Sequence, residues 1–381
     1  MRVLHVIPSV SERSGGPGMA IVPMCRQLRK RGIEVLLAAT DADVREVQCG
    51  RVVDYEGVPA IFFPAQLGAS FKYSRPLSVW LDANADRFDL GHIHAVFNHS
   101  SVAAARAFRR AGVPYVIRPL GTLDPWSMKQ KPLRKRFFWS LVGRTMVTGA
   151  ACVHYTSQTE RTATETLLGV NHGKVIPLGI DAISEATNGI RAEKPYILVL
   201  SRLHPKKGLD VLIDAFIELT QRAEFDHWQL IIAGHGPDDH VALLKRNAAA
   251  ASDRIMFTGW LDGERKEEVL RNASLLALPS YQENFGLCVM EALARAVPVL
   301  ISPHVNLAGE IEAANAGWIA PVEEHALTET LAAALSDRQE LAKRGKAGKS
   351  VSASYSWERV ATDLAELYIE IANGSAGVHR V

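Results

Sequence analysis

The sequence has no long hydrophobic run. Its 381 residues are 48% hydrophobic and 22% charged, which is ordinary for a globular protein, and no apolar stretch reaches the roughly 18 residues that a membrane-spanning helix needs. The pattern of a secretory leader is also missing, because the chain runs directly into a strand pattern at Val3 to Ile7. We therefore expect a cytoplasmic protein, and the length predicts two domains.

Cysteine is scarce and shows no paired spacing. The four cysteines lie far apart, at Cys25, Cys49, Cys152 and Cys288. This argues against a disulfide framework and a structural zinc site, and it fits reduced thiols. The G-x-G-x-x-G fingerprint of nicotinamide-dependent dehydrogenases is missing as well, so we expect no bound cofactor.

Neither sign of charge is in large excess, since the net charge is only +2, but the charge is unevenly divided. Residues 1–180 carry 23 Lys and Arg against 13 Asp and Glu, a net of +10, and residues 181–381 carry 20 against 28, a net of −8. The basic half suits a phosphate-bearing partner or an anionic membrane surface. Nucleic acid is not expected, because no binding motif accompanies the charge.

The most informative stretch runs from residue 275 to residue 301. Leu275 to Leu278 is a short apolar run that predicts a buried parallel strand, and a polar turn follows it. The next residues have helical periodicity, which Pro298 interrupts before another apolar run begins at Val299. This order predicts an α/β fold, in which ligands bind where a strand ends and a helix begins.

Two carboxylates flank that turn. Glu283 lies in the turn and Glu291 lies inside the helix, with seven residues between them, and a carboxylate can accept hydrogen bonds from two vicinal sugar hydroxyls. Unpaired N–H groups at the start of a helix attract anions. The residues expected at this helix start are Asn284, Phe285, Gly286 and Leu287.

Two further turns are rich in cations or in glycine. Residues 201–210 follow an apolar run and read S-R-L-H-P-K-K-G-L-D, so Arg202 and Lys207 lie on one strand-to-helix loop. A planar guanidinium and a lysine point charge together suit a diphosphate. Gly15 and Gly16 belong to a turn that either lets a ligand approach the backbone or serves packing alone.

Residues 280–300 resemble the E-x7-E signature of the retaining glycosyltransferases of family 4, also called group 1, and residues 201–208 resemble that family's S/G-R-L-x-x-x-K-G segment. The resemblance implies an α/β fold of two Rossmann-like domains that face a cleft, known as GT-B. It implies an acceptor-binding domain at 1–180, a donor-binding domain at 181–355 and a final helix at 356–373 that packs back on the first domain.

The resemblance also implies a hexosyltransferase. The enzyme would move a sugar from a nucleotide-diphosphate sugar, with UDP-sugar favoured over GDP-sugar, to a glycan or lipid-linked acceptor in exopolysaccharide biosynthesis. Arg202 and Lys207 would stabilise the departing diphosphate without a metal ion, and Glu283 would orient the donor sugar with retention of its anomeric configuration. Glu291 would hold the ribose. The other expected donor-binding residues are Asn284, Phe285, Gly286, Leu287, Gly15, Gly16, Gly259 and Trp260.

The acceptor is expected to bind in the first half of the chain, at His94, Arg118, Gly121 and Asp124. Many members of the family have a histidine just before this glycine, but the position here is Leu120. The departure leaves open which residue replaces that histidine.

Three alternatives remain open. The chain could bind a nucleotide sugar without transferring it, or act as a GT-B-like epimerase, although Arg202, Lys207 and both glutamates are present. Asp41-Ala-Asp43 matches the metal-binding D-x-D of a different architecture, but no further carboxylates support it and we expect a solvated loop. Lys129 to Trp139 holds five cations and three aromatic residues, which predicts either contact with the anionic inner face of the plasma membrane or a solvated helix whose aromatic residues belong to the core.

Overall fold

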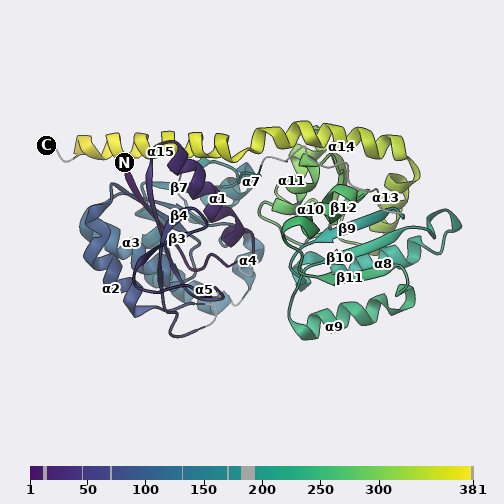
Figure 1. Cartoon of the computed structure of the whole chain (residues 1–381), viewed down its shortest axis with the longest axis horizontal. Helices are drawn as coiled ribbons and strands as arrows, with labels where there is room; N and C mark the ends of the chain where they lie inside the picture. The colour runs from purple at the N-terminus through teal and green to yellow at the C-terminus, as the bar shows by residue number, and fades with distance from the viewer. Residues whose placement is uncertain are drawn as a thin grey trace. The chain divides into compact units, whose positions relative to one another are not determined.

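The chain divides into two compact units, one made of Met1–Gly179 with Trp357–Val381 and the other of Ile180–Ser356. Each unit is an α/β domain with its own sheet and its own hydrophobic core (Figure 1). Among the described residues, no helix is both long and apolar enough to cross a bilayer. The computed structural model describes residues 1–11, 15–44, 46–68, 71–130, 132–169, 171–181 and 194–378.

An eight-stranded sheet forms the centre of the first unit. The strands are β1 (Arg2–Ile7), β2 (Glu34–Thr40), β3 (Val52–Tyr55), β4 (Val58–Phe63), β5 (Leu90–His94), β6 (Tyr115–Arg118), β7 (Cys152–Tyr155) and β8 (Gly173–Val175). They lie in the order β3-β4-β2-β1-β5-β6-β7-β8, and every neighbouring pair is parallel except β3 with β4. Strands β5, β6 and β7 are buried along their whole length, as expected for a parallel sheet with both faces covered.

Helices of the first unit begin and end where the sequence provides caps. Asn98 accepts a hydrogen bond from the Ser101 N–H at the start of the third helix, and Gly112 ends that helix with a φ of +67°. The helical segments are α1 (Gly16–Lys30), α2 (Arg75–Asn84), η2 (Ala85–Arg87), α3 (His99–Ala111), α4 (Pro125–Lys129), α5 (Pro132–Phe138), η3 (Trp139–Gly143), α6 (Arg144–Thr148), α7 (Gln158–Leu168) and α15 (Trp357–Val378). Helix α15 packs against α1, and α2 packs against α3.

The second unit has a six-stranded parallel sheet. Its strands are β9 (Tyr196–Leu200), β10 (Gln229–Ala233), β11 (Ile255–Gly259), β12 (Leu275–Leu278), β13 (Val299–Ile301) and β14 (Gly317–Ile319). They lie in the order β11-β10-β9-β12-β13-β14. The central pair is therefore β9 with β12, and the loops that follow these two strands leave the same edge of the sheet.

Helices and short 3-10 turns connect these strands and bury one face each. Phe216 and the leucines of helix α8 belong to the same continuous core as Leu230 and Leu300. The segments are η4 (Pro205–Lys207), α8 (Leu209–Leu219), η5 (Ala223–Phe225), α9 (Asp238–Asn247), η6 (Ala248–Ala251), α10 (Gly263–Asn272), α11 (Leu287–Ala294), α12 (Ala308–Ala313), α13 (Glu324–Ser336), α14 (Arg338–Ser352) and η7 (Ala353–Tyr355).

Both units have the α/β fold with parallel sheets that the sequence predicts. The sequence pattern predicts a first helix from about Met19 to Lys30, but the helix begins at Gly16, because Pro17 fits the first turn of a helix. The final helix runs from Trp357 to Val378 rather than over 356–373. Residues 182–194 are rich in Ala, Ser, Asn and Glu, which predicts a linker between the two domains, but all of them except Lys194 lie outside the described residues.

Gly91, in the buried strand β5, should not tolerate a larger side chain. A Cβ at this position would lie 2.2 Å from the ring of Phe108, so Gly91→Ala forces the ring or the strand to move. We expect Gly91→Ala to lower the free energy of unfolding by about 2 kcal/mol in urea denaturation. Gly309→Ala is the matched control, because a Cβ there meets no atom within 4 Å and alanine favours helix α12. Equal stability of the two variants would contradict this account.

Candidate active site

The loops that follow β9 and β12 meet at the carboxyl edge of the sheet in the second unit. The ammonium of Lys207 forms an ion pair with the carboxylate of Glu283. The Nζ of Lys206 donates to Oε1 of Gln282 at 2.9 Å, and the N–H of Tyr281 donates to the carbonyl of Lys206 at 2.8 Å. Side chains and backbone therefore both tie the cationic loop to the loop that carries Glu283.

Glycines make the close approach of these loops possible. Gly208 has a φ of +62°, and a Cβ there would lie 2.4 Å from the carbonyl oxygen of Pro279. In the loop after β10, a Cβ at Gly234 would lie 1.8 Å from the carbonyl oxygen of Ser201. Three strand-to-helix loops are thus packed backbone against backbone, and we refer to residues 201–208, 234–236 and 279–286 together as the cradle.

Electrostatics in the cradle favour an anion. Burial raises the pKa of Glu283, but the charges of Lys207, Lys206 and Arg202 outweigh burial and hold the pKa at about 2. One ionised carboxylate faces three cations, so the cradle keeps positive charge after the ion pair with Lys207 is counted. The side chain of Arg202 is exposed, which leaves its guanidinium accessible to a ligand. Such a site can hold a diphosphate.

Helix α11 adds its own positive potential. It begins directly after Gly286, whose φ is +73°, and its first turn contains no acidic residue. Among the described residues no side chain caps this helix, so its first N–H groups can serve a ligand. The ring of Phe285 packs against Tyr355, with 5.9 Å between centroids, and the amide of Asn306 donates to Oδ1 of Asn284 at 3.3 Å. These contacts shape the turn from within the same unit.

Glu291 lies inside α11, and among the described residues one cation pairs with its carboxylate. Its Oε1 accepts a hydrogen bond of 2.7 Å from Nζ of Lys266 on α10, and the two side chains are only 20% and 19% exposed. The other carboxylate oxygen has no partner among the described residues. It can accept from a ligand hydroxyl while Lys266 fixes the side chain.

The loop after β11 supplies an aromatic edge. The ring of Trp260 lies beside that of His235, with 5.0 Å between centroids. Gly259 has a φ of +76°, and its carbonyl accepts from the N–H of Gly234 at 2.7 Å. This hydrogen bond joins the loop to the cradle, so a base stacked here would lie at the same sheet edge as the cationic loop.

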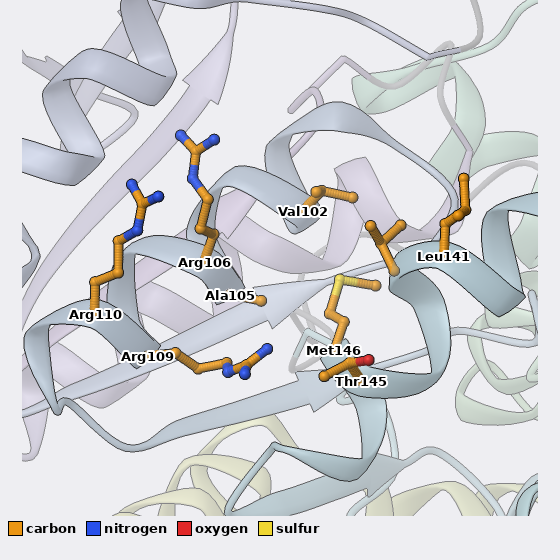
Figure 2. Close-up of a pocket in the computed structure, with 9 residues that line it drawn as sticks. Val102, Ala105, Arg106, Arg109, Arg110, Leu141, Thr145 and Met146 are labelled. Carbon is orange, nitrogen blue, oxygen red and sulfur yellow. The ribbon is translucent and has the colours of Figure 1, made fainter.

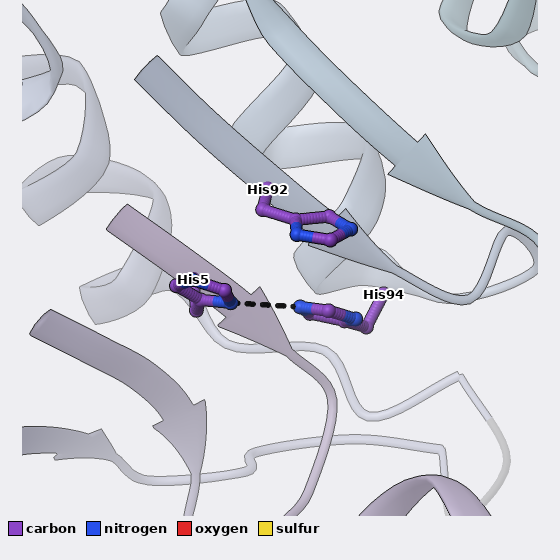
Figure 3. Close-up of side chains that lie close together, drawn as sticks. All are labelled: His5, His92 and His94. Carbon is purple, nitrogen blue, oxygen red and sulfur yellow. Dashed lines mark hydrogen bonds between the residues drawn. The ribbon is translucent and has the colours of Figure 1, made fainter. Parts of the chain in front are cut away.

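His94, in the first unit, belongs to a cluster of buried histidines. It shares one face of β5 with His92, as the alternation along the strand predicts, and His5 of β1 lies beside both. Figure 3 shows the three rings close together on one side of the sheet, with a dashed line for the 3.1 Å contact between Nδ1 of His5 and Nε2 of His94. None of the three is more than 1% exposed.

Hydrogen bonds determine the tautomers of His92 and of a fourth histidine in this cluster, His154. The carbonyl of Ile176 can only accept, so Nε2 of His154, 2.7 Å away, carries the proton. Nδ1 of His154 then accepts from Nε2 of His92 at 3.3 Å, and Nδ1 of His92 accepts from the hydroxyl of Tyr368 at 2.6 Å. A relay of neutral imidazoles therefore connects α15 to β5 and β7.

The cluster does not suit a metal ion, although ligand atoms of His5, His92 and His94 lie within 4.8 Å of one another. Both ring nitrogens of His92 are already engaged in the relay. Arg118 is 1% exposed and close enough to act on these rings: burial and, to a smaller extent, the charge of Arg118 together lower the pKa of His5 to about 3. A second cation at this place would be repelled by the first.

The last residue of β6, Arg118, and the turn after this strand hold the remaining acceptor-side candidates. Nη1 of Arg118 lies 3.3 Å from Sδ of Met24, and burial lowers the pKa of this guanidinium to about 10. Leu120, at the position where the family often has a histidine, has a φ of +58°. A non-glycine residue adopts this conformation only at a cost in energy, and such strain is common at functional sites.

Glu160 holds this turn from inside the unit. Its Oε1 accepts from the N–H of Gly121 at 2.6 Å, and its Oε2 accepts from the N–H and the hydroxyl of Thr156 at 2.8 and 2.9 Å. Asp124 is 5% exposed and directly precedes α4. The turn is therefore pre-formed around Glu160, which sequence reasoning did not identify.

The structure also places the Gly15-Gly16 turn and the Asp41-Ala-Asp43 motif. Gly15 precedes α1 with a φ of +85°, and Gly16 is the first residue of the helix. Asp41 accepts from the N–H of Ala65 at 2.8 Å, and Asp43 pairs with Lys72 at 3.3 Å. Both carboxylates of the D-x-D match thus serve the surrounding loops.

Three polar residues of the second unit were also missed. Lys206 and Gln282 could have been found, because each is adjacent in sequence to a predicted site residue, Lys207 and Glu283. Nothing in the sequence near Lys266 indicates a role in the site, because it lies on a different helix from its partner Glu291.

Comparison with known families agrees with this geometry. Residues 182–351 match the family described as "Glycosyl transferases group 1", and residues 15–179 match the one described as "Glycosyl transferase 4-like domain". The chain belongs to the group 1 glycosyltransferases. Each of the two matches falls entirely within one unit of this group 1 glycosyltransferase, so the two units correspond to the two family domains.

Curated relatives cover different shares of this glycosyltransferase. The D-inositol 3-phosphate glycosyltransferase of Nocardia farcinica is 31% identical over 51% of this chain and 46% of its own length, so the chain spans about half of that relative. The phosphatidyl-myo-inositol mannosyltransferase of Mycobacterium leprae is 26% identical over 99% of both chains.

Solved structures share the GT-B fold with this glycosyltransferase. Sucrose-phosphate synthase of Thermosynechococcus elongatus has a TM-score of 0.81 at 19% identity, covering 98% of this chain and 99% of that one. HepE of Anabaena, in complex with UDP and glucose, has a TM-score of 0.76 at 20% identity, covering 97% of this chain and 100% of that one. Likeness at this level of identity establishes the fold alone.

The histidine cluster predicts that this glycosyltransferase loses stability in mild acid. Burial lowers the pKa of all four imidazoles below 6.5 in the folded chain, so below that pH the unfolded chain binds more protons. The stability that the neutral rings provide is fully present above pH 6.5 and falls as the pH drops below it. The expected slope is up to about 1.4 kcal/mol per pH unit for each histidine, measured by urea unfolding between about pH 7 and 5.

Two variants test the source of that slope. His5→Gln removes one buried imidazole and should reduce the slope by about one proton. His227→Gln is the control, because that side chain is 46% exposed and should leave the slope unchanged. A free energy of unfolding that stays constant over this pH range would show that the cluster is not neutral in the folded state.

Proposed function

We propose that this chain is a retaining hexosyltransferase that moves a sugar from a nucleotide-diphosphate sugar, with UDP-sugar favoured over GDP-sugar, to a glycan or lipid-linked acceptor. The single observation that carries the proposal is the cradle, in which Arg202, Lys206 and Lys207 face the ionised Glu283 beside the start of α11. A structural neighbour, HepE of Anabaena, was solved in complex with UDP-glucose, which supports the choice of donor.

The proposed chemistry follows from the charges of the cradle. A departing diphosphate gains negative charge as the bond to the sugar breaks, and Arg202, Lys207 and the N–H groups of α11 stabilise that charge. Glu283, with its pKa at about 2, stays ionised and cannot act as a general acid. It accepts hydrogen bonds from donor hydroxyls and orients the sugar. The departing phosphate takes the proton of the acceptor hydroxyl, so attack on the same face retains the configuration without an enzyme nucleophile.

The remaining donor contacts come from the same edge of the second unit. Glu291, held by Lys266, accepts from the ribose hydroxyls, while Gly259 and Trp260 contact the base. Asn284, Phe285, Gly286 and Leu287 form the anion-binding helix start. We propose that the cations replace a metal ion and that no cofactor is needed. Gly15 and Gly16, at the start of α1, are proposed as further donor contacts in the first unit.

The acceptor is proposed to bind to the first unit, near His94, Gly121 and Asp124, with the buried Arg118 acting through its positive potential. The first 180 residues carry a net charge of +10, which suits an acceptor with an anionic carrier at the inner face of the plasma membrane. We therefore favour a lipid-linked glycan, as in exopolysaccharide assembly. The competing function is nucleotide-sugar binding or epimerisation without transfer, and product analysis with a glycan acceptor separates these outcomes.

Removing the two cations nearest the proposed diphosphate should abolish most of the transfer. Arg202→Ala and Lys207→Ala should each lower kcat by a factor of about a hundred or more, because each removed electrostatic stabiliser costs roughly 3 kcal/mol. Transfer from a panel of UDP-, GDP- and ADP-sugars is measured beside thermal unfolding, since Lys207→Ala leaves the carboxylate of Glu283 unpaired.

The control is Arg246→Ala, which removes an exposed arginine on α9 that has no acidic partner among the described residues. It should transfer at the wild-type rate. EDTA should not change the wild-type rate. Near-normal transfer by a variant that combines Arg202→Ala with Lys207→Ala would overturn the proposed role of the cations. Activity that EDTA removes and Mg²⁺ restores would overturn it as well.

The two glutamates should differ in what their removal affects. Glu291→Gln should weaken binding of bare UDP, because Glu291 faces the ribose, whereas Glu283→Gln should leave UDP binding nearly intact and slow transfer. Calorimetry with UDP and a transfer assay measure the two effects. Lys266→Gln is the control for the ion pair: it should weaken UDP binding less than Glu291→Gln does. Equal loss of UDP affinity in both glutamate variants would show that the roles are misassigned.

A further inference from the structure

The helical segment between β6 and β7 exposes apolar side chains that the fold does not bury. Helices α5, η3 and α6 follow one another over residues 132–148. Within them Leu133, Phe137 and Leu141 recur at every fourth position and are 79%, 67% and 60% exposed. Residues at this spacing share one face of a helix, so we call these three the apolar stripe. A surface helix normally turns its apolar face to the core, and an outward one indicates a binding surface.

The other aromatic residues of this segment face inward. Phe138 and Trp139 pack against the core of the first unit, and the ring of Phe138 lies 5.2 Å from that of Phe97. Lys135 also turns inward: its Nζ donates to the hydroxyl of Ser127 at 3.0 Å, and burial lowers the pKa of its ammonium. Phe138 and Trp139 therefore anchor this segment to the core, and the apolar stripe is not needed for that packing.

Cations surround the apolar stripe without acidic partners. Residues 129–159 contain six Lys and Arg and no acidic residue. Arg134, Arg136 and Arg144 are exposed, and none of them has a carboxylate partner among the described residues. A surface protein partner is normally matched by charges of both signs, whereas this surface is complementary to a continuous negative charge.

A pocket of about 450 Å³ extends the apolar stripe, because Leu141 lines it too. Figure 2 shows its two walls: Leu141 and Met146 come from η3 and α6, and Val102 and Ala105 come from α3. The apolar walls can hold the first carbons of an acyl chain. We call this cavity the α3 pocket.

Three arginines of α3 line the α3 pocket beside these apolar walls (Figure 2). Arg106 and Arg110 pair with Asp82, at 2.9 and 3.6 Å. Arg109 is exposed and has no acidic partner in the described part of the chain. An unpaired guanidinium at an apolar pocket is suited to a ligand with a phosphate head and an apolar tail.

We propose that the apolar stripe inserts into the surface of an anionic phospholipid bilayer, and that the α3 pocket holds the headgroup phosphate of one lipid at Arg109. The proposal rests on the proposed membrane location of the acceptor and names the surface that provides it. Outward apolar residues flanked by unpaired cations are what an interfacial helix uses to lie in a membrane. Each cation near an anionic surface contributes about fivefold to the affinity, so the arginines supply reversible attachment.

The first experiment is co-sedimentation of the full chain with vesicles. Wild-type protein should bind vesicles of phosphatidylglycerol and phosphatidylcholine, bind pure phosphatidylcholine at least tenfold less, and dissociate as salt rises. A triple variant, Leu133→Gln with Phe137→Gln and Leu141→Gln, should lose binding. The control triple, Val52→Gln with Leu243→Gln and Ile369→Gln, changes side chains that are 56%, 42% and 54% exposed and should bind like the wild type.

The second experiment tests the α3 pocket alone. Soluble dihexanoyl phosphatidylglycerol, below its micellar concentration, should raise the thermal unfolding midpoint of the wild type. Arg109→Gln should remove this shift and lower vesicle affinity about fivefold, Arg109→Lys should restore part of both, and Arg246→Gln should change neither. A shift that persists in Arg109→Gln would overturn the role of the pocket.

UDP binding, measured on the same preparations, separates this proposal from the proposed function. Vesicle binding by the wild type without binding of either UDP or GDP would leave the docking surface standing and contradict the proposed transfer from a nucleotide-diphosphate sugar. UDP binding without vesicle binding, or equal binding of the wild type and the triple variant to vesicles, would overturn the docking surface.

Discussion

The ion pair between Lys207 and Glu283 is the interaction on which the proposed donor-binding edge depends. It joins the loops after the two central strands of the second unit, and both side chains are largely shielded, at 9% and 16% exposed. Removing either partner would leave a poorly solvated charge, which costs far more than an exposed pair contributes. The neighbouring cations Arg202 and Lys206 repel Lys207, and Glu283 is what allows three positive charges to remain together. The same carboxylate thus holds the loops in place and permits their excess charge.

The sequence was sufficient to predict the strands that frame this edge. Leu275 to Leu278 and Val299 to Ile301 were identified correctly, because buried parallel strands consist of short, continuous apolar runs. Strands β3 and β14 were not identified, since four or three residues at a sheet edge carry no such signal. Arg202 and Lys207 lie on the strand-to-helix loop where their spacing placed them, and the structure adds that Lys207 is paired and Arg202 is exposed.

Other parts of the candidate sites could not be predicted, because they depend on contacts between distant segments. Lys266 reaches Glu291 from another helix, and His92 reaches Tyr368 across 276 positions of the chain. The alternation of His92 and His94 showed that the two rings share a face, but a single strand cannot show that His5 and His154 complete the cluster. For the basic stretch before Trp139 the sequence left open either membrane contact or a solvated helix with aromatic residues in the core. The fold turns Phe138 and Trp139 into the core and leaves Phe137 exposed.

The two units manage positive charge in opposite ways, and this has a functional consequence. In the second unit Lys207 is held at short range by a shielded carboxylate, and backbone hydrogen bonds fix its loop, so dissolved ions screen this cation little. In the first unit Arg109, Arg134 and Arg136 are exposed and lack carboxylate partners among the described residues, so their attraction acts over a Debye length and weakens with salt. Tight, geometric recognition of a small diphosphate requires the first arrangement, because each donor must already point at the ligand. Reversible attachment to an extended anionic surface requires the second, because no single contact then determines the lifetime of the bound state.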